Sequence, residues 1–380
     1  MIHKEMNPQK KICIAFLGNA LHDSRIVNLT NSLKADGCSV SVISFDWFIS
    51  SKDFFNDEIK IFKLAKGKFS LFFYLHFALI LIRELFRTKS DIYFAEDLYT
   101  LPFVTTIAKL KGAKVYYNSR ELYAFLGGLR NRPILQSVVK QIEKFFIRKV
   151  DLVLTTGEMD SAFLEKFYGI DNTFVIRNIP LFQTPSAKID FRKMYGISDD
   201  KMILLYQGVL LEGRGVPLIM RAMVKLPQTI LIMLGDGEQK SNFQKLAKEL
   251  NIAERVIYAG TINQRELMNY TAGADIGLSL IENISVSYYH ALPNKLFEYI
   301  MAGLPVICSD LPQMKKIVET YQVGESISIE NEENIYSVLK RWIENPVLLS
   351  TYKINCERAG KELNWQEEYK SARIKLLDLN

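Results

Sequence analysis

The residues with the clearest potential for chemistry lie around a glycine-rich loop in the second half of the chain. A predicted strand, Met202–Tyr206, runs into Gly208, and Gly213–Gly215 precedes a predicted helix. Glycines let the backbone approach an anion, the start of the helix supplies free N–H groups, and Arg214 adds a fixed positive charge. The loop therefore predicts a diphosphate site, although a tight strand-to-helix turn explains it equally well. Gly235, after the next strand, repeats the pattern.

A second group of polar residues lies in Tyr288–Pro305 (YYHALPNKLFEYIMAGLP). A proline suits the first turn of a helix and Gly303 suits the residue after its end, so a helix is predicted over about Pro293–Ala302. Lys295 and Glu298 are three residues apart and share a face of that helix. Their spacing fits a ligand-binding pair, and it also fits an ordinary surface ion pair.

Glu282, which ends the predicted strand before this segment, is a candidate contact to a sugar or to the glycine loop. A solvated acid at a strand end is an equally good interpretation. We find no convincing Asp-x-Asp or His/Cys cluster in the sequence, so no metal and no cofactor are predicted.

An alternation of short β-rich runs and helical segments positions these residues. The rhythm predicts parallel sheets covered by helices on both faces. The predicted strands are Lys11–Leu17, Ser39–Phe45, Ile92–Ala95, Lys114–Tyr117, Leu152–Thr155, Met202–Tyr206, Thr229–Leu234, Val256–Tyr258, Ile276–Leu280 and Pro305–Cys308. We therefore predict an α/β protein with two Rossmann-like, doubly wound domains facing a cleft, and ligands at the carboxyl ends of the strands.

The predicted domain boundary lies in the segment Arg177–Asp200, which has two prolines, polar turn residues and little periodicity. We expect the hinge near Pro180–Ala187. This divides the chain into an N-terminal domain over residues 1–183 and a C-terminal domain over residues 184–364.

The charge of the chain is uneven. The 380 residues include 48 Lys and Arg against 42 Asp and Glu; residues 1–180 hold 25 basic and 18 acidic residues, and the remainder hold 23 and 24. Nucleic-acid binding is not predicted, because no dense basic stripe or recognised motif accompanies the excess. An anionic membrane surface or an anionic acceptor fits better. Four scattered cysteines and a polar N-terminus predict a cytoplasmic protein.

The apolar run Ser70–Ile82 is too short to span a bilayer, which needs about 20 residues. Its flanks make it suggestive, because cations bracket it and Glu84 is the one acid between Lys60 and Lys89. These cations are Lys60, Lys63, Lys66, Lys68, Arg83, Arg87 and Lys89. Residues 60–89 therefore predict either a helix seated in an anionic membrane interface or a helix buried against a sheet, and the two can coexist on different faces.

Taken together, these segments resemble a known family. PNKLFEYIMAGLPVI, preceded by GVLLEGRG and LGDG, looks like the C-terminal half of the family-four retaining glycosyltransferases (glycosyl transferases group 1) of GT-B fold. Phe16–Ser44 resembles the family's opening βαβ unit, and DIYFAEDLYTLP its next strand and loop. Trp365 and a final helix resemble its closing segment. The resemblance implies that residues 365–380 pack back on the N-terminal domain.

The resemblance also implies a reaction. In this family a nucleotide-diphospho-sugar binds the C-terminal domain, an acceptor hydroxyl binds across the cleft, and the anomeric configuration is retained without a metal. Negative charge builds on the departing diphosphate, so cations and N–H dipoles aimed at it supply the main stabilisation.

The family's site residues carry over to matching positions. Arg214 is assigned to the diphosphate, and Glu298 matches the second glutamate of the family's E-x7-E motif, which accepts hydrogen bonds from the ribose. The loops after Leu234 and Tyr258 are expected beside the nucleobase. The residues expected on the donor side are Gly18, Asn19, Gly208, Gly213, Gly235, Glu282, His290, Leu292, Pro293, Asn294 and Lys295.

The chain departs from the family pattern at several positions. His290 stands where the motif has its first glutamate. VYYNSRELY (Val115–Tyr123) resembles the family's VYDSHELY, with Asn118 for Asp and Arg120 for the His near the transferred sugar. Arginine cannot act as a general base, because guanidinium stays protonated. We place Asn118, Arg120 and Glu121 on the acceptor and sugar side. Arg120 either binds an anionic group there, pairs with Glu121, or is a solvated arginine.

The leading functional prediction is a peripherally membrane-bound glycosyltransferase that extends a lipid-linked or cell-surface glycan. The alternative is a catalytically silent, nucleotide-sugar-binding subunit of a glycan-assembly complex, which the replaced His and Glu positions suggest. A sugar-nucleotide epimerase is disfavoured because its acidic and histidine pairs are not apparent. An NAD oxidoreductase is disfavoured because Gly18 stands without GxGxxG.

Overall fold

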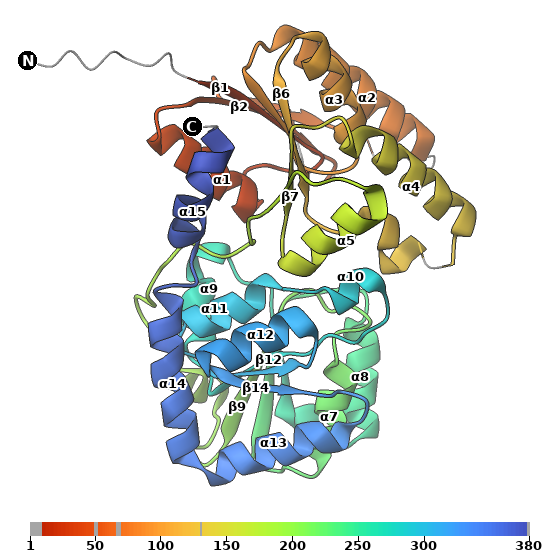
Figure 1. The fold of residues 1–380 in the computed structure, drawn as a ribbon. Helices are drawn as coiled ribbons and strands as arrows, with labels where there is room; N and C mark the ends of the chain where they lie inside the picture. Colours follow the sequence, from red (N-terminus) through yellow and green to blue (C-terminus); the bar gives the residue numbers. More distant parts are fainter. Residues whose placement is uncertain (1–9, 49–51, 66–69, 130, 378–380) are drawn as a thin grey trace, which may run out of the picture. The chain divides into compact units, whose positions relative to one another are not determined.

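The computed structural model describes residues 10–48, 52–65, 70–129 and 131–377, and divides the chain into two compact units, Met1–Arg177 and Asn178–Asn380. Each unit contains its own sheet with helices packed on it (Figure 1). The predicted α/β class with two Rossmann-like parallel sheets is confirmed.

The first unit has a sheet of order β3-β4-β2-β1-β5-β6-β7-β8, in which the pair β3 and β4 is antiparallel and the other pairs are parallel. Its strands are β1 (Lys11–Phe16), β2 (Ser39–Asp46), β3 (Phe54–Phe55), β4 (Ile59–Lys63), β5 (Ile92–Ala95), β6 (Lys114–Ser119), β7 (Leu152–Thr155) and β8 (Thr173–Val175). Its helices are α1 (Ser24–Ala35), α2 (Ser70–Arg87), α3 (Leu101–Leu110), α4 (Pro133–Ile147) and α5 (Glu158–Tyr168), with short 3-10 turns at Tyr123–Phe125 and Gly127–Leu129.

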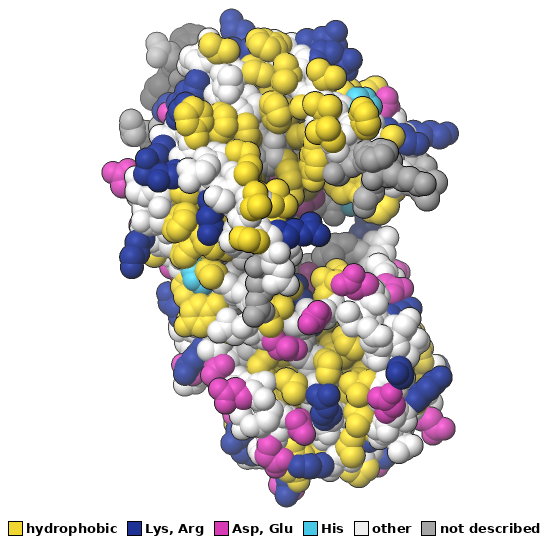
Figure 2. Space-filling view, turned by 90° about the vertical axis from the view of Figure 1, so that its right-hand side faces the viewer, with side chains coloured by type: hydrophobic (Ala, Val, Ile, Leu, Met, Phe, Trp, Pro, Cys, Tyr) yellow, Lys and Arg dark blue, Asp and Glu magenta, His cyan; other side chains and the backbone are white. Residues whose placement is uncertain are grey.

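Helices α2, α3 and α4 pack in sequence on one face of this sheet. Helix α2 buries Phe77, Leu81 and Leu85 in the core below it. Its outer face is also apolar, with Phe72 and Leu79 about 70% exposed. Figure 2 shows hydrophobic side chains gathered on the first unit among Lys and Arg. Helix α2 thus has one apolar face buried in the core and a second apolar face exposed to solvent.

The second unit has a parallel sheet of order β11-β10-β9-β12-β13-β14. Its strands are β9 (Met202–Gln207), β10 (Thr229–Leu234), β11 (Val256–Gly260), β12 (Ile276–Ser279), β13 (Val306–Ser309) and β14 (Gly324–Ile327). Its helices are α6 (Phe191–Tyr195), α7 (Val216–Val224), α8 (Lys240–Glu249), α9 (Gln264–Thr271), α10 (Val286–Tyr289), α11 (Asn294–Met301), α12 (Pro312–Tyr321), α13 (Glu332–Glu344), α14 (Pro346–Gly360) and α15 (Trp365–Leu377), with a 3-10 turn at Ala253–Arg255.

Helices bury both faces of the second sheet. Successive side chains of a strand point to opposite sides, so each strand contributes to two cores. In β9, Ile203 and Leu205 join the core under α11, α12 and α14, whereas Leu204 and Tyr206 join the core under α7, α8 and α13. Continuous apolar strands such as β10 (TILIML) follow from this double burial.

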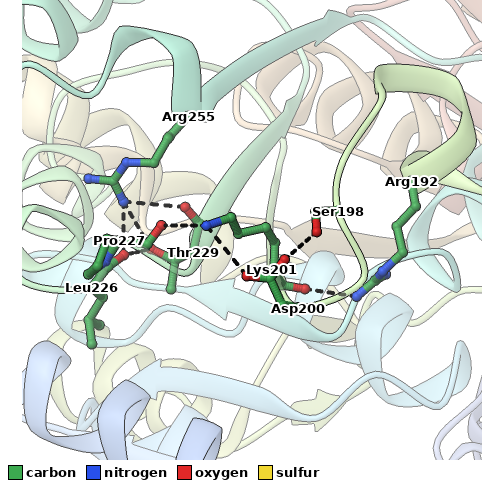
Figure 3. A network of polar contacts seen from close by, with 8 residues as sticks. All are labelled: Arg192, Ser198, Asp200, Lys201, Leu226, Pro227, Thr229 and Arg255. Atoms are coloured by element: carbon green, nitrogen blue, oxygen red, sulfur yellow. Dashed lines mark hydrogen bonds and ion pairs between the residues drawn. The ribbon is translucent and has the colours of Figure 1, made fainter.

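Polar contacts fasten the amino-terminal edge of the second sheet (Figure 3). Arg255 donates to the carbonyl oxygens of Leu226 at 2.8 Å and Thr229 at 3.3 Å, while Arg192 donates to that of Lys201 at 2.9 Å. These groups precede or begin β9 and β10. Ligands of parallel α/β sheets bind at the opposite, carboxyl edge.

The structure refines several expected elements. Helix α2 continues to Arg87, five residues beyond the predicted apolar run, and α11 begins at Asn294 with Pro293 as its N-cap. Strands β3, β4, β8 and β14 were not predicted, because they are short and, apart from part of β4 and Ile327 of β14, exposed or half-buried. Among the described residues, no helix is long and apolar enough to cross a membrane.

Candidate functional site

A cavity of about 590 Å³ lies at the carboxyl ends of β9, β10 and β11 in the second unit. The loop after β9 contributes Gly208 and Arg214, and the loop after β10 contributes Gly235. The start of α11 contributes Lys295 and Glu298. The cavity therefore brings together the glycine loops and the Lys-Glu pair that the sequence singled out separately.

Backbone geometry explains the glycines that follow β9 and β10. Gly208 and Gly235 have φ angles of +126° and +143°. A Cβ atom on Gly235 would lie 2.0 Å from the carbonyl oxygen of Gly208. Gly235 can therefore pack on Gly208 only without a side chain, whereas Gly208 has open space around it and is favoured by its positive φ alone. The two turns leave backbone, rather than side chains, facing the cavity.

The glycine loop before α7 is held by an acid. Gly215 has φ +66°, takes the N-cap position of α7, and donates its N–H to Glu282 Oε1 at 3.2 Å. The N–H of Glu282 in turn donates to the carbonyl oxygen of Gly213 at 3.0 Å. Glu282 does not line the cavity. Its contacts match the loop-ordering interpretation of this residue.

Arg214 lies in this loop and lines the cavity. Its guanidinium carbon lies 5.0 Å from the centroid of the Tyr288 ring, which holds the cation by a cation–π contact. This leaves the five N–H donors of a permanent cation next to the cavity.

Lys295 is the second cation at the cavity, and only 8% of it is exposed. Its Nζ lies 4.1 Å from the centroid of the Tyr206 ring. Burial first, and then the positive charge of Arg214, lower the pKa of Lys295 to about 7, while Glu298 acts in the opposite direction. Two cations crowded against a cavity, one of them with a pKa lowered to about 7, indicate a site for an anion.

Glu298 is fixed by a chain of side-chain hydrogen bonds. Its Oε2 accepts from Gln207 Nε2, and Gln207 Oε1 accepts from Thr271 Oγ1 at 2.8 Å. Burial raises the pKa of Glu298, against the lowering effect of the bonds from Gln207 and Gln264. A carboxylate held in this way presents oxygen acceptors to hydroxyl groups in the cavity.

Of the remaining donor-side candidates in this unit, some line the cavity and others do not. Pro293 and Asn294 line the cavity with the first turn of α11. Gly213, His290 and Leu292 are not among the lining residues. His290 is 9% exposed, its carbonyl oxygen accepts from Gln313 Nε2, and Leu292 packs against the core.

Apolar and polar groups alternate on the wall formed by the loops after β10 and β11. Leu234, Ile262 and Leu267 supply apolar surface, and Thr261 and Gln264 supply hydrogen-bonding groups. A flat heteroaromatic ring suits such a wall, because it needs apolar faces and polar edges.

In the first unit, one guanidinium nitrogen of Arg120 forms an ion pair with both oxygens of a carboxylate. Its Nη2 lies 2.8 Å and 2.7 Å from the two carboxylate oxygens of Asp23, not of the neighbouring Glu121, which is exposed. Its guanidinium carbon also lies 4.9 Å from the centroid of the Phe16 ring. The partner of Arg120 is therefore Asp23, which is 97 residues away in the sequence, and not Glu121, which the sequence had suggested as one possibility.

Asn118 lies in a fully buried polar chain beside this pair. Its Nδ2 donates to Glu96 Oε2 at 2.8 Å, and its Oδ1 accepts from Arg25 at 2.8 Å. Glu96 Oε1 has no hydrogen-bond partner among the described residues. Burial raises the pKa of Glu96 to about 7, against the opposing charges of Arg120 and Arg25.

Gly18 and Asn19 follow β1 at the same edge of the sheet. A Cβ atom on Gly18 would lie 2.5 Å from the Phe16 ring, so glycine lets that ring turn under the loop. Asn19 Nδ2 donates to Asp46 Oδ2 at 2.7 Å. At the same edge, Asp97 Oδ2 accepts a hydrogen bond from the N–H of Leu17 at 2.7 Å.

Sequence reasoning missed Asp23, Glu96, Gln207 and Thr271. Glu96 and Asp97 directly follow β5, and Gln207 ends β9. The rule that ligands lie at the carboxyl ends of parallel strands pointed to these three positions. No local signal identified Asp23 or Thr271, whose partners are distant in sequence.

Comparisons with known proteins agree with this geometry. Residues 187–362 match the family model described as Glycosyl transferases group 1. A stretch of 164 residues, 43% of this chain, is 27% identical to the Campylobacter jejuni N-acetylgalactosamine-N,N'-diacetylbacillosaminyl-diphospho-undecaprenol 4-alpha-N-acetylgalactosaminyltransferase and covers 42% of that protein. The matched stretches span less than half the length of the first curated relatives.

Solved structures match along the whole chain. Sucrose-phosphate synthase from Thermosynechococcus elongatus superposes with a TM-score of 0.81 at 16% identity, covering 98% of this chain and 99% of that one. Anabaena HepE in complex with UDP gives a TM-score of 0.71 at 15% identity, covering 98% and 100%. At these identities the likeness establishes the fold, which is GT-B.

Proposed function

We propose that this chain, in which residues 187–362 match the glycosyl transferases group 1 family and which has the GT-B fold, transfers a sugar, with retention, from a nucleotide-diphospho-sugar to a glycan or lipid-linked acceptor in cell-surface polysaccharide synthesis. One observation carries the proposal. Arg214 and Lys295 crowd their positive charges against one cavity, and Glu298 lies beside them on the same cavity.

The chemistry of the cavity fits the donor. Breaking the bond between sugar and diphosphate builds negative charge on the diphosphate, and Arg214, Lys295 and the first turn of α11 stabilise that charge. Glu298 accepts hydrogen bonds from the ribose hydroxyls, and the wall with Leu234 and Ile262 takes the base. HepE in complex with UDP has the same fold, which supports testing uridine nucleotides first.

We place acceptor binding in residues 1–183, donor binding in residues 184–364, and helix 365–380 against the N-terminal domain. Asn118, Arg120 and Glu121 belong to the acceptor and sugar side. Asp23 pairs with one nitrogen of the Arg120 guanidinium, and no hydrogen bond to a described residue occupies its other two nitrogens, so the guanidinium retains donors for an anionic group. Sugar transfer with retention needs no side-chain base when the leaving phosphate takes the acceptor proton.

An acceptor carried in a membrane agrees with the outer face of α2. Leu71, Phe72, Leu75 and Leu79 are 50% to 70% exposed, which is more apolar surface than a solvated helix carries. Lys60, Arg83 and Arg87 converge on Glu84, so the helix end stays positive. Lys66 and Lys68 lie outside the described residues. We therefore propose peripheral attachment to an anionic, cytoplasmic membrane surface through residues 60–89.

A thermal-shift screen of nucleotide-sugars tests the donor site. One diphospho-sugar is expected to raise the Tm, as a ligand that binds the folded state must. Arg214→Ala is expected to abolish that rise, whereas Arg221→Ala, which removes an arginine from α7 outside the cavity lining, is expected to keep it. No response to any nucleotide-sugar would contradict the proposal.

Flotation with vesicles tests the membrane surface separately. The chain is expected to float with anionic vesicles at low salt and to lose this binding at high salt. Leu75→Ser with Leu79→Ser is expected to weaken flotation. Failure of the unaltered chain to float at low salt would show that α2 does not bind membranes.

A further inference from the structure

A strip of aromatic side chains crosses the first unit, formed by Trp47, Phe73, Tyr74, Tyr99 and Tyr123. We infer that this aromatic strip is the platform on which the sugar rings of the acceptor stack. The inference rests on the proposed function and names the part of the molecule that holds the acceptor.

The strip is continuous. The ring centroids of Trp47 and Phe73 lie 5.7 Å apart, and those of Phe73 and Tyr74 lie 5.3 Å apart. Tyr74 stacks on Tyr99 at 5.7 Å with an interplanar angle of 14°, and Tyr99 meets Tyr123 edge-on at 6.3 Å. Each spacing lies within the range of favourable aromatic pairs.

The strip follows the edge of the sheet where ligands bind. Trp47 comes directly after β2, Tyr99 lies in the loop after β5, and Tyr123 lies in the turn after β6. Phe73 and Tyr74 lie in the first turns of α2. The strip therefore runs along the carboxyl ends of parallel strands, from the apolar start of α2 toward Arg120.

The middle of the strip is open to solvent. Tyr74 and Tyr99 are 42% and 44% exposed. They remain this exposed although their rings stack on each other. Burial raises the pKa of Tyr99 to about 12, helped by its contact with Tyr74. Its hydroxyl therefore stays a neutral donor and acceptor at any physiological pH.

Sugar rings match this combination better than a lipid chain does. A pyranose ring offers a face of C–H bonds, which meets the negative face of an aromatic ring, and a rim of hydroxyls that need polar partners. The strip ends at Tyr123, within electrostatic reach of Asp97 and Arg120. An alkyl chain would gain nothing from these charged groups, and it would be penalised for desolvating them.

Saturation-transfer NMR on the full chain tests the strip directly, with a panel of methyl hexosides and methyl N-acetylhexosaminides as probes. At least one glycoside is expected to receive saturation on its ring C–H protons. Tyr99→Ala and Tyr74→Ala are each expected to raise its Kd about tenfold, which is about 1.4 kcal/mol. Tyr99→Phe keeps the ring and is expected to stay within about twofold.

Phe54→Ala is the matched control. Phe54 lies on β3 outside the strip and is 43% exposed, almost as much as Tyr99. It is expected to bind like the unaltered chain, and melting curves confirm that each variant is folded. The inference would be overturned if the unaltered chain bound no glycoside, or if both alanine variants bound the glycoside as tightly as the unaltered chain does.

The same samples separate this inference from the proposed function. Donor stabilisation in the thermal-shift screen depends on the second unit, and glycoside binding depends on the first. Loss of glycoside binding in Tyr99→Ala with normal donor stabilisation supports both. Normal donor stabilisation without a Tyr99-dependent signal rejects the strip alone, and a Tyr99-dependent signal without any donor response rejects the proposed function alone.

Discussion

Buried Lys295 predicts that donor affinity depends on pH. In the free protein its pKa is lowered to about 7, by burial first and by Arg214 second. A bound diphosphate surrounds the amine with negative charge and returns its pKa toward the ordinary value, so binding takes up a proton above pH 7. Affinity is therefore highest well below pH 7 and falls as pH rises through 7.

The size of the effect follows from the charged fraction of Lys295. With a pKa of about 7, about nine-tenths of the molecules carry the charge at pH 6 and about one-tenth at pH 8. The donor Kd is therefore expected to rise about tenfold between pH 6 and pH 8, or about 1.4 kcal/mol. Below pH 6 it is expected to be flat.

Titration calorimetry with UDP-glucose at pH 6, 7 and 8 measures this dependence. A nucleotide-sugar is the right ligand, because a nucleoside diphosphate has a terminal phosphate that titrates near neutral pH. Repeating the pH 8 titration in two buffers of different ionisation enthalpy counts the protons taken up, and we expect close to one.

Lys295→Arg is the control, because guanidinium keeps its charge throughout this range. This variant is expected to bind with a Kd that is nearly independent of pH. A flat Kd in the unaltered chain would refute the role of Lys295, and so would an equal slope in Lys295→Arg.

Three further predictions follow from the geometry. Glu298→Gln removes a charged acceptor and is expected to lower kcat/KM for the donor about 10- to 100-fold; unchanged steady-state kinetics would argue against a ribose contact. Asp23→Asn removes the charge that pairs with half-buried Arg120 and is expected to lower the free energy of unfolding by about 2 kcal/mol in urea titrations; a loss near zero would show that the pair is not structural. Gly235→Ala places a Cβ atom 2.0 Å from the carbonyl oxygen of Gly208 and is expected to abolish donor stabilisation. Gly260→Ala has open space around the new Cβ atom and is expected to lower the free energy of unfolding by only about 1 kcal/mol. Equal effects of the two variants in melting curves would contradict this.

Local patterns were enough to predict much of the fold. The strands Ile92–Ala95, Leu152–Thr155 and Thr229–Leu234 lie at their predicted bounds, because uninterrupted apolar runs between turn residues are typical of strands buried on both faces. The exposed pair Phe54 and Phe55 shows the limit. A two-residue edge strand carries no periodicity to detect.

Pairings across the fold were beyond the sequence. Neighbouring residues suggested Glu121 as the partner of Arg120, yet only the packing of α1 against the sheet brings Asp23 there. The hydrogen bonds of Gln207 could not be predicted for the same reason, because its partners Glu298 and Thr271 lie on helices 91 and 64 residues away in the sequence. The positions of Lys295 and Glu298 on one helix face were predictable, since three residues separate them.

The most direct test of the whole account is the phosphorus NMR spectrum of a nucleotide-sugar incubated with the purified chain and a membrane extract that supplies acceptor. The account predicts that one diphospho-sugar is consumed, that a terminal diphosphate resonance of the free nucleotide appears, and that Arg214→Ala prevents both. A nucleotide-sugar that binds tightly, yet survives intact with acceptor present, would contradict transfer and identify a silent nucleotide-sugar-binding subunit instead.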